Sequence, residues 1–177
     1  MKHLPQRKQI RLKNYDYSQS GYYFITLCTK DQKHSLGQIQ EGVMALNPYG
    51  QIVDRCISKI EDIYASVKLD CKVVMPNHVH FIISTVGIPN LANLNFKEVS
   101  FQERSKMLIP KILQQFKTAT IKLTKELGRQ HGMLPLQWQR GYYDHIIRSE
   151  ASYQQIYAYI ETNPLKWTLD KYYSDSG

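Results

Sequence analysis

A chain of 177 residues, 42% of them hydrophobic and 21% charged, is long enough to fold as one domain over residues 1–177, and no run of about 20 apolar residues is present to cross a membrane. The formal net charge of +8 and the 13 tyrosines favour a polyanionic partner, and nucleic acid is the first candidate for it. Three scattered cysteines and a basic N-terminus (Met1–Lys8) without an apolar run behind it argue against a disulfide framework, a zinc knuckle and a secretory signal.

The first half of the chain alternates strand signals with one helix. Runs of aromatic and β-branched residues, broken at 41–42 and 76–77, indicate strands. Asn47 and Pro48 form a helix start, with Asn as the N-cap and Pro as the first helical residue. The predicted elements in this half are strands at 22–29, 70–75 and 78–85, a hairpin at 35–46, and a helix from Asn47 to about Tyr64.

The second half predicts two longer helices. Residues 87–98 are polar and are predicted to form a loop, whereas apolar residues recur with a helical period from Ile109 to Leu127, with Gly128 as the C-cap. The remaining predicted elements are a strand or extended segment at 138–147, a helix from Ser149 to about Asn163, and a short helix through Trp167 and Leu169. This order predicts an α+β sandwich in which helices pack on one antiparallel sheet.

The most informative stretch is residues 75–83, which carries two histidines two positions apart. Side chains alternate along a strand, so His78 and His80 point to one face, while Val79, Phe81 and Ile83 point to the other face, where a core is expected. Two adjacent imidazoles are suited to holding a divalent cation. The alternative is a half-buried strand with two surface histidines.

The helix that begins after Ser149 carries a second pair of polar groups. Tyr159 and Asn163 are four residues apart and therefore share one helical face. A tyrosine hydroxyl can act as a nucleophile, and an amide oxygen can bind a hard divalent ion. The alternatives are a packing tyrosine and an Asn that only marks the helix end before Pro164, with Gln155 as a lesser rival for the ligand.

Four motifs follow one another along nearly the whole chain. They are Tyr23-Phe24-Ile25-Thr26, Met75-Pro76-Asn77-His78-Val79-His80, Trp138-Gln139-Arg140-Gly141-Tyr142-Tyr143-Asp144-His145, and Tyr159-Ile160-Glu161-Thr162-Asn163-Pro164. In this order they resemble the single-tyrosine HUH transposases, in which HUH stands for His, a bulky apolar residue and His. The closest resemblance is to the REP-associated tyrosine transposases.

The resemblance implies a fold and an activity. The fold would be a ferredoxin-like α+β sandwich, with the His pair on a central strand of an antiparallel sheet. The activity would be cleavage and rejoining of single-stranded DNA, with Tyr159 forming a 5′-phosphotyrosine link and releasing a 3′-hydroxyl. Mg²⁺ or Mn²⁺ would be held by His78, His80 and Asn163, and would offset the charge that develops on the phosphate.

The implied partner is single-stranded DNA that carries a hairpin or palindromic repeats. A homodimer and a monomer both remain open, no membrane partner is expected, and the expected location is the cytoplasm, at the nucleoid. Basic and aromatic residues are the candidate DNA contacts, since charge follows the backbone and rings stack on bases. These candidates are Arg140, Tyr142, Tyr143, Arg148, Lys117 and Lys122, for which packing or an ordinary surface position is the alternative.

Two other classes of protein are alternatives to a transposase. A histidine-triad nucleotide hydrolase also carries His-x-His on a strand, but it needs a third alternate histidine, and position 82 is Ile. A catalytically inactive or domesticated sequence-specific DNA-binding protein is the stronger alternative, although the intact His78, His80 and Tyr159 argue against it. For His145, the sequence favours equally a place near the site and a structural role as a hydrogen-bonded histidine.

Overall fold

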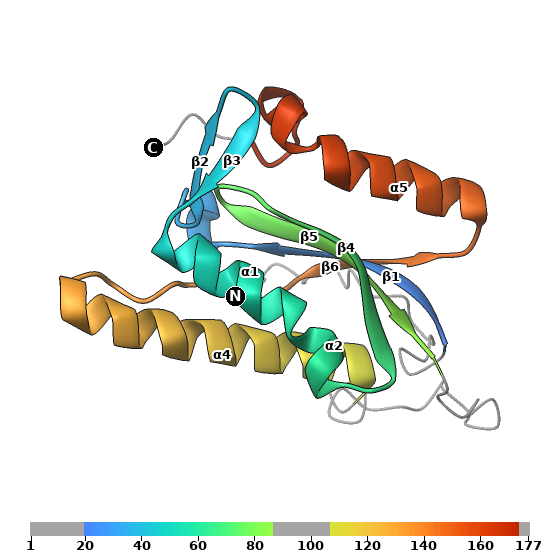
Figure 1. Cartoon of the computed structure of the whole chain (residues 1–177), viewed down its shortest axis with the longest axis horizontal. Coiled ribbons are helices and arrows are strands. Elements are labelled where there is room, and N and C mark those ends of the chain that lie inside the picture. The colour runs from blue at the N-terminus through green and yellow to red at the C-terminus, as the bar shows by residue number, and fades with distance from the viewer. Residues whose placement is uncertain (1–19, 87–106, 174–177) are drawn as a thin grey trace, which may run out of the picture.

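The computed structural model describes residues 20–86 and 107–173, and a four-stranded antiparallel sheet lies at its centre (Figure 1). The strand order is β4-β5-β1-β6, so β5 and β1 are the two inner strands. A separate hairpin lies beside one end of this sheet. The strands are β1 (Gly21–Cys28), β4 (Val67–Val74), β5 (His78–Thr85) and β6 (Tyr143–Ile147) in the sheet, and β2 (Gly37–Gln40) and β3 (Val43–Leu46) in the hairpin.

Helices cover both faces of the central sheet. In Figure 1, α1 and α4 lie against one face, and α5 crosses the other face. Two short 3₁₀ helices complete the described part of the chain. The helices are α1 (Pro48–Ser58), α2 (Ile60–Ile63), α4 (Leu108–His131), α5 (Glu150–Thr162), η1 (Lys30–Gln32) and η3 (Pro164–Leu169).

The order of elements confirms the predicted ferredoxin-like sandwich. Leaving the small hairpin aside, the chain runs β1, α1, β4, β5, α4, β6, and the last strand pairs with the edge of β1. Every pair of neighbouring strands in the central sheet is antiparallel, as the resemblance implied. The helix α5 follows this unit and adds a layer on the second face.

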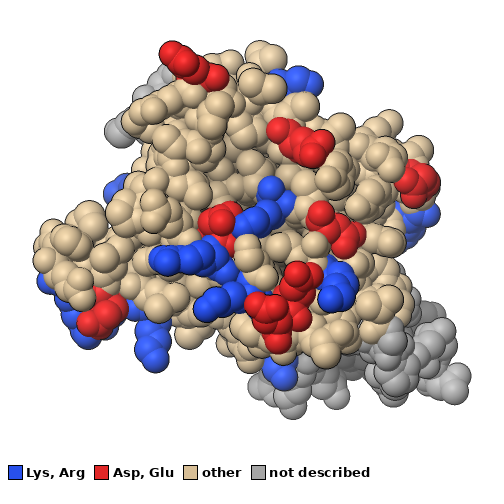
Figure 2. All heavy atoms as spheres, viewed as in Figure 1, with Lys and Arg blue, Asp and Glu red and all other residues tan. Residues whose placement is uncertain are grey.

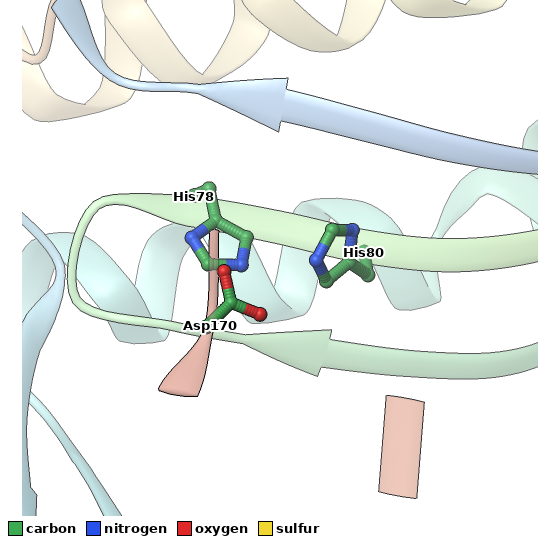
Figure 3. Close-up of side chains that lie close together, drawn as sticks. All are labelled: His78, His80 and Asp170. Carbon is green, nitrogen blue, oxygen red and sulfur yellow. The ribbon is translucent and has the colours of Figure 1, made fainter. Parts of the chain in front are cut away.

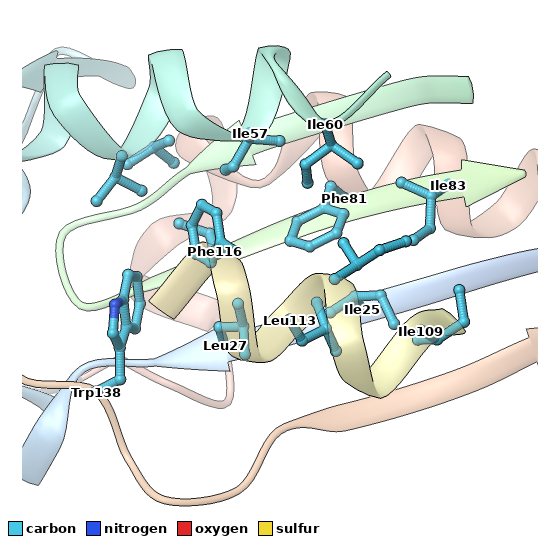
Figure 4. Close-up of a cluster of buried hydrophobic side chains, with 14 of the residues drawn as sticks. Ile25, Leu27, Ile57, Ile60, Phe81, Ile83, Ile109, Leu113, Phe116 and Trp138 are labelled. Atoms are coloured by element: carbon cyan, nitrogen blue, oxygen red, sulfur yellow. The ribbon is translucent and has the colours of Figure 1, made fainter. Parts of the chain in front are cut away.

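The main hydrophobic core lies between the sheet and the helices α1 and α4 (Figure 4). Val79, Phe81 and Ile83 of β5 point into it, which confirms the alternation predicted for this strand. Ile25 and Leu27 of β1 point the same way. Burial of these side chains stabilises the sheet by about 25 cal/mol per Å² of apolar surface. Because these residues must point into the core, the alternate residues of β5 point to the other side of the sheet.

Some predicted boundaries differ from the structure. The predicted C-cap Gly128 is wrong, because α4 continues to His131 and ends at Gly132, whose φ of 66° is left-handed. Gly128 lies inside the helix, where a Cβ would be 2.4 Å from the carbonyl oxygen of Met133. The predicted helix to Tyr64 is interrupted at Lys59, between α1 and α2.

Other boundaries moved by a few residues, and some predictions cannot be compared. The final strand begins at Tyr143 rather than at Trp138, which forms only an isolated bridge with Thr29. The loop predicted at 87–98 and the basic segment Met1–Lys8 lie outside the described residues. No helix in the described ranges combines the length and the apolar composition that crossing a membrane requires.

Candidate active site

The two histidines lie at the start of β5, on the sheet face away from the main core. Pro76 and Asn77 form the tight turn from β4, and the amide N–H of Met75 donates to the carbonyl of His78 at 2.8 Å. Both imidazoles are fully buried, beneath residues that follow α5. Their ring centroids are 4.5 Å apart, so the shared face predicted from the spacing is confirmed.

The side chain of Asn77 fixes the tautomer of His78. Its amide nitrogen donates to the carbonyls of Gln32 and Tyr172, at 3.2 and 2.8 Å, which leaves its Oδ1 to face Nδ1 of His78 at 2.8 Å. An amide oxygen can only accept, so Nδ1 of His78 carries the proton. The lone pair of a neutral His78 is therefore on Nε2, and this buried atom has no hydrogen-bond partner.

His80 is oriented by the neighbouring strand. Thr26 is its register partner on β1, and the Thr26 hydroxyl lies 2.8 Å from Nδ1 of His80. The hydroxyl can donate or accept, so it supports either neutral tautomer. The other ring nitrogen, Nε2, faces the hydroxyl oxygen of Tyr159 at 3.1 Å. Hydrogen bonds of this kind at Nδ1 orient a histidine that binds a metal through Nε2.

Tyr159 and Asn163 approach the histidines from the C-terminal part of α5. Ser149 begins this helix as its N-cap and Asn163 ends it, as the sequence predicted. The Tyr159 hydroxyl and the Asn163 amide nitrogen both donate to Oδ2 of Asp170, at 2.7 and 2.6 Å. The two side chains therefore share one face of the helix and one partner, and that face is turned toward the imidazole pair.

Asp170 is the site residue that sequence reasoning missed. It follows η3, and Figure 3 shows its carboxylate beside the two imidazoles. The ligand atoms of His78, His80 and Asp170 all lie within 4.8 Å of one another. One signal was present, an acidic residue seven positions after Asn163, but nothing in the spacing indicates that η3 returns the chain to β5.

The donor atoms in this site fit a divalent cation. Nε2 of His78 and Oδ1 of Asn163 are both buried and lack a hydrogen-bond partner, which is uncommon for buried polar atoms. Nε2 of His80 and the carboxylate of Asp170 lie beside them. Two imidazoles, an amide oxygen and a carboxylate suit Mn²⁺ better than a purely oxygen-seeking Mg²⁺.

Burial sets the protonation of the imidazole pair. It lowers the pKa of His78 to about 4, against an opposing effect of the Asp170 charge. It also lowers the pKa of His80 well below its ordinary value, and the charge of a protonated His78 would lower it further. Both rings are therefore neutral near pH 7, the form in which imidazole binds a metal.

The pKa values of the candidate nucleophile, Tyr159, and of its hydrogen-bond partner, Asp170, are shifted in opposite directions. Burial raises the pKa of the Tyr159 hydroxyl, and its hydrogen bond to Asp170 raises it further. Burial alone would raise the pKa of Asp170, but hydrogen bonds from the Tyr172 amide, Tyr159 and Asn163 outweigh it and hold the pKa below the ordinary value. In the metal-free site the tyrosine is thus protonated and the aspartate ionised.

We expect the metal-free protein to lose stability as the pH falls from about 6.5 to about 4. The unfolded chain protonates its histidines near pH 6.5, whereas the folded chain keeps His78 neutral down to about pH 4, so protons favour unfolding within this window. With about 1.4 kcal/mol for each pKa unit, His78 contributes on the order of 3 kcal/mol. Urea unfolding of the wild type and of His78→Gln between pH 8 and pH 4 measures this contribution. If the free energy of unfolding changes equally with pH in both proteins, His78 is not its source.

Among the predicted DNA contacts, Tyr143 lies nearest the site. It is 38% exposed, and its ring lies 6.3 Å from that of Phe24, which itself contacts His80 and Tyr159. The ammonium of Lys171 lies over the Tyr143 ring at 5.1 Å and over the Tyr172 ring at 4.8 Å. Lys171 is a second residue that the sequence did not single out, and it places a positive charge at this edge of the site.

The adjacent Tyr142 points the other way. It packs against the main core on the α4 side of the sheet, which favours the packing role that was its alternative. Arg140 and Arg148 are exposed at the two ends of the segment that contains β6, and His145 is exposed on β6. Their proposed contacts with DNA stay predictions.

The two predicted lysine contacts belong to α4, on the opposite side of the sheet from the histidines (Figure 1). Nζ of Lys117 donates to the carbonyls of Gln139 and Gly141, at 2.6 and 2.7 Å, and so holds the segment before β6. Lys122 is exposed. On the face shown in Figure 2, acidic side chains are interspersed among the basic ones, so the net charge of +8 is not gathered into one patch there.

Comparison with known proteins finds a relative in sequence and several similar solved structures. The chain is 38% identical over 174 residues to an uncharacterized protein of Haemophilus influenzae. The matched region covers 96% of this chain and 94% of that protein. No family model matches the chain.

Two of the similar solved structures are described as transposases. One is a REP-associated tyrosine transposase bound to a REP hairpin, with a TM-score of 0.49 and 19% identity, covering 95% of this chain and 77% of that chain. The other is a proposed transposase of Deinococcus radiodurans, with a TM-score of 0.46 and 18% identity, covering 85% of this chain and 96% of that chain.

Proposed function

We propose that this chain, which belongs to one family with the Haemophilus influenzae protein, is a metal-dependent single-stranded DNA transesterase of the single-tyrosine HUH transposase type. The observation that carries the proposal is the convergence of a tyrosine hydroxyl, two neutral imidazoles and an amide oxygen in one buried site. Two separate elements supply these groups, namely β5 and α5 with its C-cap Asn163, and the segment after η3 adds Asp170. A nucleophile beside a set of metal-binding atoms is the arrangement that phosphoryl transfer requires.

Tyr159 is the proposed nucleophile because its oxygen lies 3.1 Å from Nε2 of His80, at the edge of the ligand set. As its oxygen forms a bond to phosphorus, the bond from phosphorus to the 3′ oxygen breaks, and that oxygen leaves as an oxyanion that takes a proton from water to become the 3′-hydroxyl. The tyrosine proton can pass to Asp170, which accepts its hydrogen bond at 2.7 Å. The strand that carries the 5′ phosphate is then linked to Tyr159.

His78, His80 and Asn163 are the proposed ligands, with Asp170 as an additional candidate. A divalent metal bound by them would supply Lewis-acid stabilisation of the charge on the phosphate. The carboxylate of Asp170 has two candidate roles, since the same oxygen accepts from Tyr159 and from Asn163. The chain's own contribution is to hold the two imidazoles neutral, to turn Nε2 of His80 toward Tyr159 and to leave Nε2 of His78 without a competing hydrogen bond.

A covalent intermediate favours strand transfer over plain hydrolysis. The phosphotyrosine bond keeps the energy of the cleaved phosphodiester, so a 3′-hydroxyl can reverse the reaction without ATP. The motif resemblance makes hairpin-forming single strands the proposed substrate. A protein that processes such DNA would work in the cytoplasm, at the nucleoid.

We expect hairpin-bearing single strands to be cut in Mn²⁺ or Mg²⁺, and the same sequence as a perfect duplex to be left uncut. The proposed ligands and Tyr159 lie under α5, with both imidazoles fully buried, so a flexible unpaired strand is expected to reach them more readily than a stiff duplex. Affinity should fall about 10-fold or more between 50 and 200 mM salt if several phosphates are contacted. Denaturing gels of a hairpin library detect the covalent adduct, and fluorescence anisotropy gives the salt slope.

The same experiment separates the enzyme from a DNA-binding protein that has lost its activity. Binding without any adduct, across the library and with either metal, favours the inactive or domesticated protein. Equal cleavage of the perfect duplex, or binding that does not depend on salt, contradicts the proposed substrate.

A further inference from the structure

A cavity of about 420 Å³ lies beside the proposed active site, between the β2–β3 hairpin and η3. Its volume is within the range of pockets that hold small molecules. Trp167 of η3 connects the two places, because it lines the cavity and its ring lies 5.9 Å from the ring of His78. A ligand that contacts the Trp167 ring is therefore one side chain away from His78.

Three aromatic rings line one part of the cavity. The ring of Trp167 lies 5.7 Å from that of His34 and 5.3 Å from that of Tyr173, and all three residues line the cavity. Leu165 adds an apolar side chain that is 71% exposed. A flat ring system fits such walls, since base stacking on aromatic side chains is favourable for every base.

The polar groups of the cavity are amides, hydroxyls and one imidazole. Gln38, Thr168 and His34 line it, and no Asp, Glu, Lys or Arg is among the described residues of its wall. A phosphate would find no lysine or arginine there, whereas an amide can exchange hydrogen bonds with the edge of a base. The chemistry of the wall therefore selects a nucleobase over a phosphate.

The cavity keeps its shape because the hairpin and η3 are in close contact. Gly42, at the tip of the hairpin, has a φ of 77°, and a Cβ on it would lie 2.7 Å from Cδ2 of Leu165. A larger residue at this position would force the Leu165 side chain to shift. The hairpin and η3 therefore meet at this edge of the cavity.

We propose that this cavity binds one unpaired base of the DNA strand, next to the phosphate that Tyr159 attacks. The inference rests on the proposed function and adds to it a place where the strand is read or anchored. A second cavity of about 250 Å³, lined by Tyr22, Arg148 and Tyr153, is less suited to this role. Tyr22 lies four residues along β1 from Thr26, the partner of His80, so that cavity is about 13 Å farther along the sheet.

The test uses photochemical cross-linking in the full-length Tyr159→Phe protein, which binds DNA without cutting it. The probe is a (dT)10 strand with one 4-thiothymine, placed at each position in turn, and mass spectrometry locates the cross-links. We expect cross-links in residues 34–39 or 165–173 for one or two adjacent probe positions. Cross-links confined to other parts of the chain, or none at all, overturn the proposal.

A pair of exposed leucines supplies the matched variants. Leu165 lines the cavity, whereas Leu169 is 83% exposed and does not. Leu165→Glu places a negative charge at the cavity and should reduce the cavity cross-links about tenfold, while Leu169→Glu should leave them within about twofold. Equal yields from the two variants, with equal thermal unfolding, contradict a base in the cavity.

The outcomes also separate this inference from the proposed function. A DNA adduct on Tyr159 in the wild type, together with cross-links only outside the cavity, overturns the base site and leaves the enzyme standing. Cross-links in the cavity without any adduct overturn the enzyme and leave the base site standing.

Discussion

Tyr159→Phe is expected to abolish the covalent protein–DNA adduct, by more than about 10³-fold, while DNA and metal binding persist. The substitution removes the one oxygen that lies 3.1 Å from Nε2 of His80 and keeps the ring against Phe24. The lost hydrogen bond to Asp170 should cost about 1 kcal/mol of stability. Denaturing gels measure the adduct, and anisotropy and calorimetry measure the binding of DNA and Mn²⁺.

The same helix offers a control for this substitution. Tyr157 is partly exposed and contacts Tyr153, at a ring distance of 6.0 Å, rather than the histidines, so Tyr157→Phe should keep the adduct within about twofold. Mass spectrometry of the wild-type adduct should place the DNA on the peptide that contains Tyr159. DNA found instead on Tyr143 or Tyr153 would show that the wrong tyrosine was chosen and would leave the reaction class intact.

Replacement of both histidines is expected to have the second largest effect. The double variant His78→Ala, His80→Ala should lose cleavage and should bind Mn²⁺ more than about 100-fold more weakly, because two of the proposed ligands are gone. Both rings are fully buried, so the alanines should also lower the stability of the metal-free protein by about 1–3 kcal/mol. Calorimetric titration with Mn²⁺ and the adduct assay measure the two losses.

The buried position of the pair calls for variants that separate chemistry from folding. His78→Gln and His80→Gln fill most of the volume and still supply an amide group each, so the fold should survive while the adduct is lost. His131→Ala, at the exposed end of α4, removes a histidine far from the site and should change neither metal binding nor cleavage. Cleavage at the wild-type rate by the double alanine variant, with Mg²⁺ or Mn²⁺ present, would refute the metal assignment.

The sequence by itself determined the parts of the site that depend on local periodicity. The period of two along a strand was sufficient to put His78 and His80 on one face and Phe81 on the other. The period of a helix was sufficient to align Tyr159 with Asn163, and Ser149 marked where that helix begins. These predictions were accurate because each depends on a repeat of only a few residues.

Only the tertiary structure decided which distant groups meet at the site. Thr26 orients His80 from across the sheet, and Asp170 reaches Tyr159 only because η3 turns the chain back toward β5. The same holds for Lys117, whose positive charge is used within the chain, on the far side of the sheet from the histidines. Strand register and the packing of a helix on one sheet face depend on contacts between residues far apart in the chain, and no local pattern encodes those contacts.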